Sequence, residues 1–186
     1  MTTNGRQIIV QMHGEPGSGK STIARELRRA LGAIVLDKDV IKAALLRTGV
    51  GEAQAAPAAY EAFFELAADL AAQGRSLVLD NPVYWPRIED KWIRLAERNI
   101  AARVMIECVC ADRTELARRL AARQSLESQP RVPLAPRKAA IDFEPASPRM
   151  VLDTLRPVGE NVERALAYIG EQTELAERAA KSELVR

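Results

Sequence analysis

The residues with the clearest chemistry lie near the start of the chain, where Gly14–Ser21 has the pattern G-x-x-x-x-G-K-S. Glycines at this spacing let the backbone curl so that successive N–H groups converge on phosphate oxygens. The lysine would reach the outer phosphates of a nucleotide, and the serine hydroxyl would coordinate Mg²⁺. The pattern therefore predicts a loop that binds ATP and Mg²⁺, formed by Gly14, Glu15, Pro16, Gly17, Ser18, Gly19, Lys20, Ser21 and Thr22. The competing interpretation is a loop that only turns the chain.

Three carboxylates follow two later apolar runs. Asp37 and Asp39 come after Ala33–Leu36, and Asp80 follows a run that ends at Leu79. Open parallel sheets collect ligands at the carboxyl ends of their strands, so we expect these carboxylates beside the phosphate loop. One would organise Mg²⁺ and another would accept the proton of an attacking hydroxyl. The alternatives are that Asp39 only caps the following helix and that Asp80 is only a turn residue.

The elements that must position these residues alternate between short apolar runs and helical patterns. This alternation predicts an α/β fold with a five-stranded parallel sheet flanked by helices, in one domain spanning residues 1–186. Together with the glycine-rich loop between the first strand and helix, it indicates a P-loop NTPase fold. The expected strands are Ile8–Met12, Ala33–Leu36, Ser76–Leu79, Arg103–Cys110 and Met150–Leu152. The expected helices are Ile23–Leu31, Ile41–Leu46, Glu52–Gln73, Ile88–Arg98, Thr114–Arg123 and Val158–Ile169.

Composition restricts the class of partner. The 27 basic and 25 acidic residues give a net charge of +2, so no overall field gathers nucleic acid or an anionic membrane. The N-terminus has no apolar signal core, and no apolar stretch reaches the length of about 18 residues that a membrane span requires. We therefore expect a soluble cytoplasmic protein without a membrane partner. Its two cysteines, Cys108 and Cys110, lie in an apolar run, which indicates core packing.

Several patterns distinguish among nucleotide-binding classes. The glycines do not form G-x-G-x-x-G, which disfavours a dinucleotide-binding oxidoreductase. Asp80 is followed by Asn81 and not by the glutamate that a motor ATPase commonly uses to orient water. This difference favours transfer of phosphate to a bound substrate. His13, the only histidine, is expected to be a packing residue and not a catalytic one.

Beyond the loop, the chain resembles the small P-loop kinases, which include phage polynucleotide kinase, gluconate and shikimate kinases, chloramphenicol phosphotransferase and the zeta toxins. The resemblance implies that Asp39 is the general base, because the D-x-x-R form of the polynucleotide kinases falls on Asp39–Lys42. Lys42 stands where those enzymes have arginine, so the planar fork that grips phosphate is lost. The resemblance rests on Gly14–Thr22, Leu36–Lys42, Leu79–Asp80 and Leu116–Arg123.

The lid of this family resembles Leu116–Arg123, and we expect a lid at about residues 116–149. Arg119 and Arg123 lie four residues apart on one helix face, from which they would close over ATP and neutralise charge on the transferring phosphoryl group. The alternative is a solvated basic helix face. Four further cations in the following segment have no assigned role, namely Arg131, Arg137, Lys138 and Arg149.

The acceptor is expected between the lid and the Glu52–Gln73 helix. Its binding residues would be Asp39, Lys42, Tyr84 and Trp85, of which the two aromatic residues would stack on a ring or only pack. The sequence thus predicts a kinase that moves the γ-phosphate of ATP to a hydroxyl of a small molecule, with Lys20, Asp39, Arg119 and Arg123 as catalytic residues and Ser21, Asp37 and Asp80 at the metal. The alternatives are a polynucleotide 5′-hydroxyl kinase and an ATP-binding switch without phosphate transfer.

Overall fold

The computed structural model describes residues 6–83, 85–122, 126 and 145–183. Its five strands form one parallel sheet in the order β2–β3–β1–β4–β5. The central strand β1 leads directly into the phosphate loop, and all of its residues are buried. The strands are β1 (Ile8–His13), β2 (Ile34–Asp37), β3 (Leu77–Asp80), β4 (Ala102–Val109) and β5 (Arg149–Asp153). The predicted five-stranded parallel sheet is confirmed.

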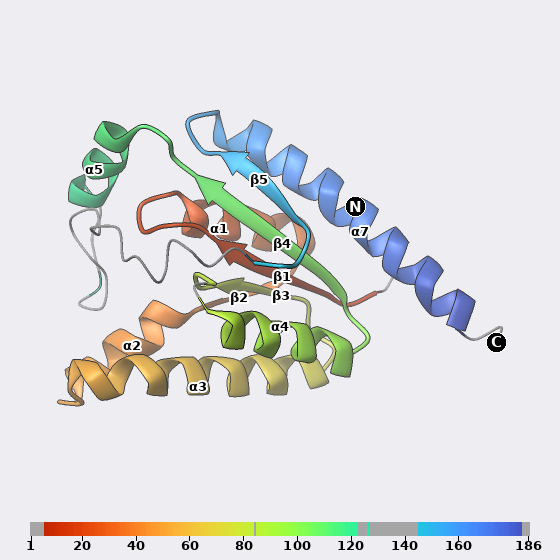
Figure 1. Ribbon diagram of the computed structural model, residues 1–186, viewed down its shortest axis with the longest axis horizontal. Coiled ribbons are helices and arrows are strands. Elements are labelled where there is room, and N and C mark those ends of the chain that lie inside the picture. The colour runs from red at the N-terminus through yellow and green to blue at the C-terminus, as the bar shows by residue number, and fades with distance from the viewer. Residues whose placement is uncertain (1–5, 84, 123–125, 127–144, 184–186) are drawn as a thin grey trace.

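Helices cover both faces of this sheet (Figure 1). One face packs against α1 (Lys20–Leu31) and α7 (Val158–Glu183), and the other packs against α3 (Glu52–Ala72) and α4 (Pro86–Arg98). Two further helices, α2 (Lys38–Arg47) and α5 (Arg113–Ala122), stand at the end of the sheet toward which the strands point. The predicted α/β fold, with helices on both faces of a parallel sheet, is therefore confirmed.

The core divides into two layers because successive residues of a strand point to opposite faces. In β1, Val10 packs in the cluster that includes Leu27 of α1, whereas Ile9 packs in the cluster that includes Phe63 of α3 and Trp92 of α4. Burial on both faces explains why the strands have continuous apolar runs and no polar alternation. The two layers hold β1 rigidly, and with it the start of the phosphate loop.

The start of α2 corrects one expectation about the carboxylates. A side-chain oxygen of Asp37 accepts a hydrogen bond of 2.8 Å from the backbone N–H of Asp39, so Asp37 is the helix cap. Asp39 lies inside the first turn of α2. The alternative in which Asp39 serves only as the cap is therefore wrong, because the helix begins one residue after the strand ends.

The cysteines are packed as expected. Cys108 is buried between the sheet and its α1 and α7 face, and Cys110 is buried against Leu116 and Leu120 of α5. Burial raises the pKa of the Cys108 thiol to about 12, so this thiol stays protonated and unreactive. Within the described ranges, no helix is both long enough and apolar enough to span a bilayer.

Candidate active site

The phosphate loop connects β1 to α1 and depends on three glycines with positive φ angles. Gly14, Gly17 and Gly19 have φ values of 124°, 83° and 91°, which side chains with a Cβ rarely adopt. The backbone carbonyl of Glu15 accepts hydrogen bonds from the Ser18 N–H at 3.1 Å and from Lys20 Nζ at 2.9 Å. These bonds curl the loop and hold the lysine over it.

Each glycine also allows a different element to approach the loop. A Cβ on Gly14 would lie 2.2 Å from the carbonyl oxygen of Cys108. A Cβ on Gly17 would lie 2.9 Å from Leu120 of α5, and one on Gly19 would lie 3.4 Å from Thr154, just after β5. The loop is therefore supported from three sides by β4, α5 and the end of β5.

The first turn of α1 follows this loop, and the N–H groups of Thr22 and Ile23 donate there to the Gly19 carbonyl at 3.1 Å. The first N–H groups of any helix have no carbonyl one turn earlier to which they could donate. Gly19 is the cap residue, and no side chain caps these groups. There is no acidic residue in the first turn of α1. The N-terminus of α1 is therefore suited to an anion, which both the N–H groups and the helix dipole favour.

Two of the predicted carboxylates meet at the ends of neighbouring strands. Asp37 and Asp80 are partners in the register between β2 and β3. Burial, and after it the negative charge of Asp80, raises the pKa of Asp37 to about 6. Burial also raises the pKa of Asp80, against the opposing effects of Lys20 and of a hydrogen bond with Ser21. The proximity that the sequence predicted is thus present.

These groups suit a magnesium ion. Ser21, Asp37 and Asp80 supply hydroxyl and carboxylate oxygens, which are the ligands that Mg²⁺ prefers. Two buried carboxylates side by side repel each other, and a bound cation would relieve that repulsion. No three acidic, histidine or cysteine side chains converge into a complete metal site among the described residues. Mg²⁺ in nucleotide sites uses only one or two carboxylates and completes its shell with water and phosphate.

Asp39 lies in the first turn of α2, two residues after Asp37. Its side chain pairs with Lys38 at 2.6 Å, and its charge contributes to the raised pKa of Asp80. The Lys38 ammonium also lies 5.3 Å from the centre of the Tyr60 ring on α3. Lys38 therefore contacts both the Asp39 carboxylate and the Tyr60 ring.

The aromatic side of the site involves a residue that the sequence analysis did not single out. The ring of Tyr60 meets that of Trp85 edge to face, with centroids 6.2 Å apart, and the Tyr60 hydroxyl donates to the carbonyl of Pro82 at 3.4 Å. Arg87 lies over the other aromatic ring, 5.5 Å from the centre of Trp85. The helical spacing of Tyr60 with Phe63 and Phe64 in α3 indicates only a packing face. Tyr84, the other predicted stacking residue, lies outside the described residues.

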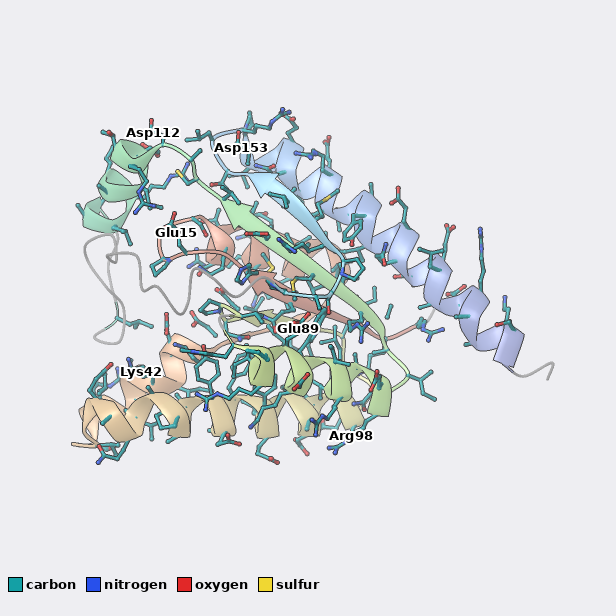
Figure 2. All side chains as sticks on the ribbon, in the orientation of Figure 1. Glu15, Lys42, Glu89, Arg98, Asp112 and Asp153 are labelled. Atoms are coloured by element: carbon teal, nitrogen blue, oxygen red, sulfur yellow. The ribbon has the colours of Figure 1, made fainter. Side chains whose placement is uncertain are left out.

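Lys42 connects two helices. Its side chain is largely buried, and its ammonium pairs with the carboxylate of Glu52 in the first turn of α3. Figure 2 shows Lys42 on α2, on the opposite side of the sheet's end from α5. Its positive charge is therefore already balanced by a protein carboxylate.

Arg119, one of the two predicted lid arginines, is held by specific contacts. Its Nη1 donates to the Thr154 hydroxyl at 2.9 Å and its Nη2 to the Thr154 carbonyl at 2.8 Å, while its Nε donates to Glu115 at 2.8 Å. Arg119 therefore does not lie on a solvated face but joins α5 to the end of β5, beside Gly19. Arg123 and most of the expected lid, residues 123–125 and 127–144, lie outside the described residues.

Behind the loop, His13 is a packing residue as expected. Its Nδ1 accepts a hydrogen bond of 3.1 Å from the Val83 N–H, and burial lowers its pKa to about 4. The imidazole is therefore neutral at physiological pH. It lies 4.0 Å from Glu107, which in turn accepts a 2.5 Å hydrogen bond from Arg149. Arg149, which had no assigned role, is thus part of this buried polar cluster.

Glu89 is a second buried acidic residue that the sequence did not reveal. Its carboxylate accepts hydrogen bonds from the backbone N–H groups of Ala146 at 3.1 Å and Ser147 at 2.7 Å. Glu89 lies in the first turn of α4, so it anchors the segment that leads into β5 to the α4 face of the sheet (Figure 2).

Comparisons with known proteins agree with this fold. A family model described as "AAA domain" matches residues 9–145. Among solved structures, a Janibacter sugar kinase is 19% identical with a TM-score of 0.62, covering 88% of this chain and 94% of its own. A gluconokinase from Sinorhizobium meliloti is 19% identical with a TM-score of 0.60, covering 98% of this chain and 99% of its own.

The APS kinase of Mycobacterium tuberculosis, solved in complex with AMPPNP and APS, is 17% identical with a TM-score of 0.63, covering 88% of this chain and 98% of its own. None of the curated proteins matches the chain. At these identities the structural similarities show a shared fold, whereas the family model covers most of the chain, including the phosphate loop and all three carboxylates. The chain therefore belongs to the AAA domain family.

Proposed function

We propose that the protein is an ATP-dependent phosphotransferase that moves the γ-phosphate of ATP to a hydroxyl group of a small molecule. The observation that carries this proposal is the placement of Asp37 and Asp80 in register beside Ser21, with Asp39 two residues farther along the chain. A protein that only binds nucleotide has no need of a further carboxylate beyond the metal-binding pair. A kinase needs one to accept the proton of the attacking hydroxyl.

The roles of the residues follow from their positions. The N–H groups of the loop and Lys20 would bind the β- and γ-phosphates, and Ser21, Asp37 and Asp80 would hold Mg²⁺. When bound, Mg²⁺ bridges phosphate oxygens and neutralises charge that develops on them during transfer. Asp39 would accept the hydroxyl proton, and its ion pair with Lys38 would orient its carboxylate. Arg119, held beside the loop by Thr154, would neutralise charge on the transferring phosphoryl group.

The acceptor side favours a small molecule. Tyr60 and Trp85 present aromatic surface next to Lys38 and Asp39, which suits the face of a ring-bearing compound. The solved relatives are named as kinases of gluconate, of sugars and of APS, all small molecules. The polynucleotide alternative would use the position of Lys42 to grip a phosphate, but Lys42 is paired with Glu52. We therefore favour the small-molecule acceptor.

The test is transfer of labelled γ-phosphate from ATP to a pool of small hydroxyl metabolites and, separately, to 5′-hydroxyl oligonucleotides. The Asp39→Asn variant should lose transfer while keeping ATP binding. Asp69→Asn, which alters an exposed aspartate of α3, is the matched control and should retain transfer. Label on the metabolite pool supports the proposal, and label on the oligonucleotides alone would replace it with the polynucleotide kinase. Wild-type transfer by Asp39→Asn would exclude Asp39 as the base.

A further inference from the structure

The phosphate loop contains a carboxylate that opposes its expected ligand. Glu15 is the first residue after Gly14, and its side chain is partly exposed. A carboxylate within a few ångströms of a polyphosphate site lowers the positive potential that the loop amides and Lys20 create. A nucleotide-binding loop with this residue therefore needs a means to offset the negative charge.

Arg113, the first residue of α5, lies in the position to do so. Its Nη1 donates to both carboxylate oxygens of Glu15, at 2.8 Å and 2.9 Å, across a sequence separation of 98 residues. No other ion pair of Glu15 is present among the described residues. In Figure 2, Glu15 lies on the loop close to α5, whose N-terminus is marked by Asp112.

The position of Arg113 is fixed by its helix. A side-chain oxygen of Asp112 caps α5 by accepting from the N–H groups of Thr114 at 2.8 Å and Glu115 at 3.1 Å. On the same side, Leu116 and Leu120 pack so closely against Gly17 that a Cβ there would lie within 3.1 Å of each. The loop and α5 therefore form one packed unit, and the ion pair lies at its edge.

We propose that Arg113 is a positioning residue that neutralises Glu15 and turns its carboxylate away from the phosphates. Without Arg113, the Glu15 carboxylate would be available to the nearest remaining cation of the loop, Lys20, whose ammonium already donates to the Glu15 carbonyl at 2.9 Å. The Lys20 ammonium would then form an ion pair with the Glu15 carboxylate in competition with the nucleotide phosphates. This inference rests on the nucleotide site of the proposed function, but not on its acceptor.

The test is the dissociation constant of AMPPNP with Mg²⁺, measured by calorimetry at low salt for a double-mutant cycle. Arg113→Ala should weaken binding about 3- to 10-fold, and this loss should shrink as salt is raised, because a partly exposed charge is screened. Glu15→Gln should bind at least as tightly as the wild type. The double variant should return to within about 2-fold of Glu15→Gln, since no carboxylate remains to be neutralised. Arg113→Lys should retain most of the affinity.

Arg118→Ala is the matched control, because Arg118 is also an exposed arginine of α5 but pairs with Glu115 on its own helix. It should leave affinity unchanged, and unfolding temperatures of all variants should confirm intact folds. A double variant as weak as Arg113→Ala would overturn the proposal, because Arg113 would then act on the nucleotide or on helix position and not on Glu15.

An equal loss of AMPPNP affinity in Arg118→Ala would also overturn the proposal, because it would show that any positive charge on α5 contributes to binding. If AMPPNP binding follows the expected cycle but no acceptor is phosphorylated, the proposed function fails while this inference stands. If the wild-type protein binds no AMPPNP, both fail.

Discussion

Asp37 and Asp80 face each other in the register of β2 and β3, so two carboxylates lie side by side at the end of the sheet where the phosphate loop begins. Burial, followed by the charge of Asp80, raises the pKa of Asp37 to about 6. In the absence of a cation this pair opposes folding at neutral pH. The carboxylates of Asp37 and Asp80 therefore repel each other when both are ionised, and a bound metal–nucleotide complex would reduce that repulsion.

The first prediction concerns pH and stability. The pKa of Asp37 is about 6 in the fold, above the 3.8 of an unperturbed aspartate, so the folded state binds the proton more tightly. Protonated Asp37 therefore contributes stability that is fully present below about pH 4 and is lost as pH rises through 6. Asp37→Asn, which can still cap α2, should be more stable than the wild type at pH 7 by about 2 to 3 kcal/mol and nearly equal to it at pH 4.

Urea unfolding of both proteins between pH 4 and pH 7 measures this difference. His13, whose pKa is lowered to about 4, contributes with the opposite sign, since its stability is lost as pH falls from 6.5 toward 4. Because His13 is present in both proteins, its contribution cancels in the comparison. A difference that did not change with pH would show that Asp37 ionises normally.

The second prediction distinguishes the role of Asp37 from that of Asp39. If Asp37 holds the metal, Asp37→Asn should raise the Mg²⁺ concentration for half-maximal phosphate transfer about 10-fold or more. If Asp39 is the base, Asp39→Asn should lower kcat at least about 100-fold with an unchanged Mg²⁺ requirement. Initial rates across a Mg²⁺ series give both quantities. An exchange of these two phenotypes would assign the base to Asp37.

The third prediction concerns Gly14. An alanine there would require a positive φ of 124° and a Cβ only 2.2 Å from the Cys108 carbonyl, so Gly14→Ala should destabilise the fold by about 3 kcal/mol or more. Gly32→Ala is the matched control, since Gly32 also has a positive φ, 64°, but its Cβ would meet nothing within 4 Å. It should cost only about 1 kcal/mol, and chemical denaturation measures both. Equal losses would mean that backbone conformation alone matters.

The fourth prediction concerns the buried anchor at Glu89. Removal of its carboxylate leaves the N–H groups of Ala146 and Ser147 without their acceptor, so Glu89→Ala should lower the free energy of unfolding by about 2 to 4 kcal/mol. Glu89→Gln keeps one acceptor oxygen and should lose less. Asp90→Ala, at the exposed neighbouring position, should have little effect in the same denaturation experiment. Similar losses at both positions would show that negative charge near the N-terminus of α4, and not the anchor, is responsible.

The sequence was sufficient to predict the loop between β1 and α1, the order of strands and helices along the chain, and the positions of Asp37 and Asp80 at strand ends. These features depend on local patterns, namely glycine spacing, apolar runs, and acidic residues where those runs end. The exact boundary between β2 and α2 was harder to predict, because the pattern allowed either Asp37 or Asp39 to be the first residue of the helix or its cap. The structure shows that Asp37 is the cap.

Contacts between distant segments could not be predicted. Arg113 and Glu15 are 98 residues apart, and Glu89 and Ser147 are 58 apart, with no pattern that relates one partner to the other. The helical spacing of Tyr60 identifies the buried side of α3. It does not show that Tyr60 lies at the edge of that side, next to Trp85. Such pairs become visible only when the topology brings their elements together.

The residues that support the phosphate loop are synthesised well after the loop itself during translation. The loop lies at residues 14–22, but its three glycines pack against Cys108, Leu120 and Thr154, which the ribosome adds about 90 or more residues later. Translation therefore delivers the loop long before its last neighbour. A nascent chain that has not reached Thr154 lacks one of the supports of the loop, so a bound nucleotide could assist folding only after Thr154 has been added.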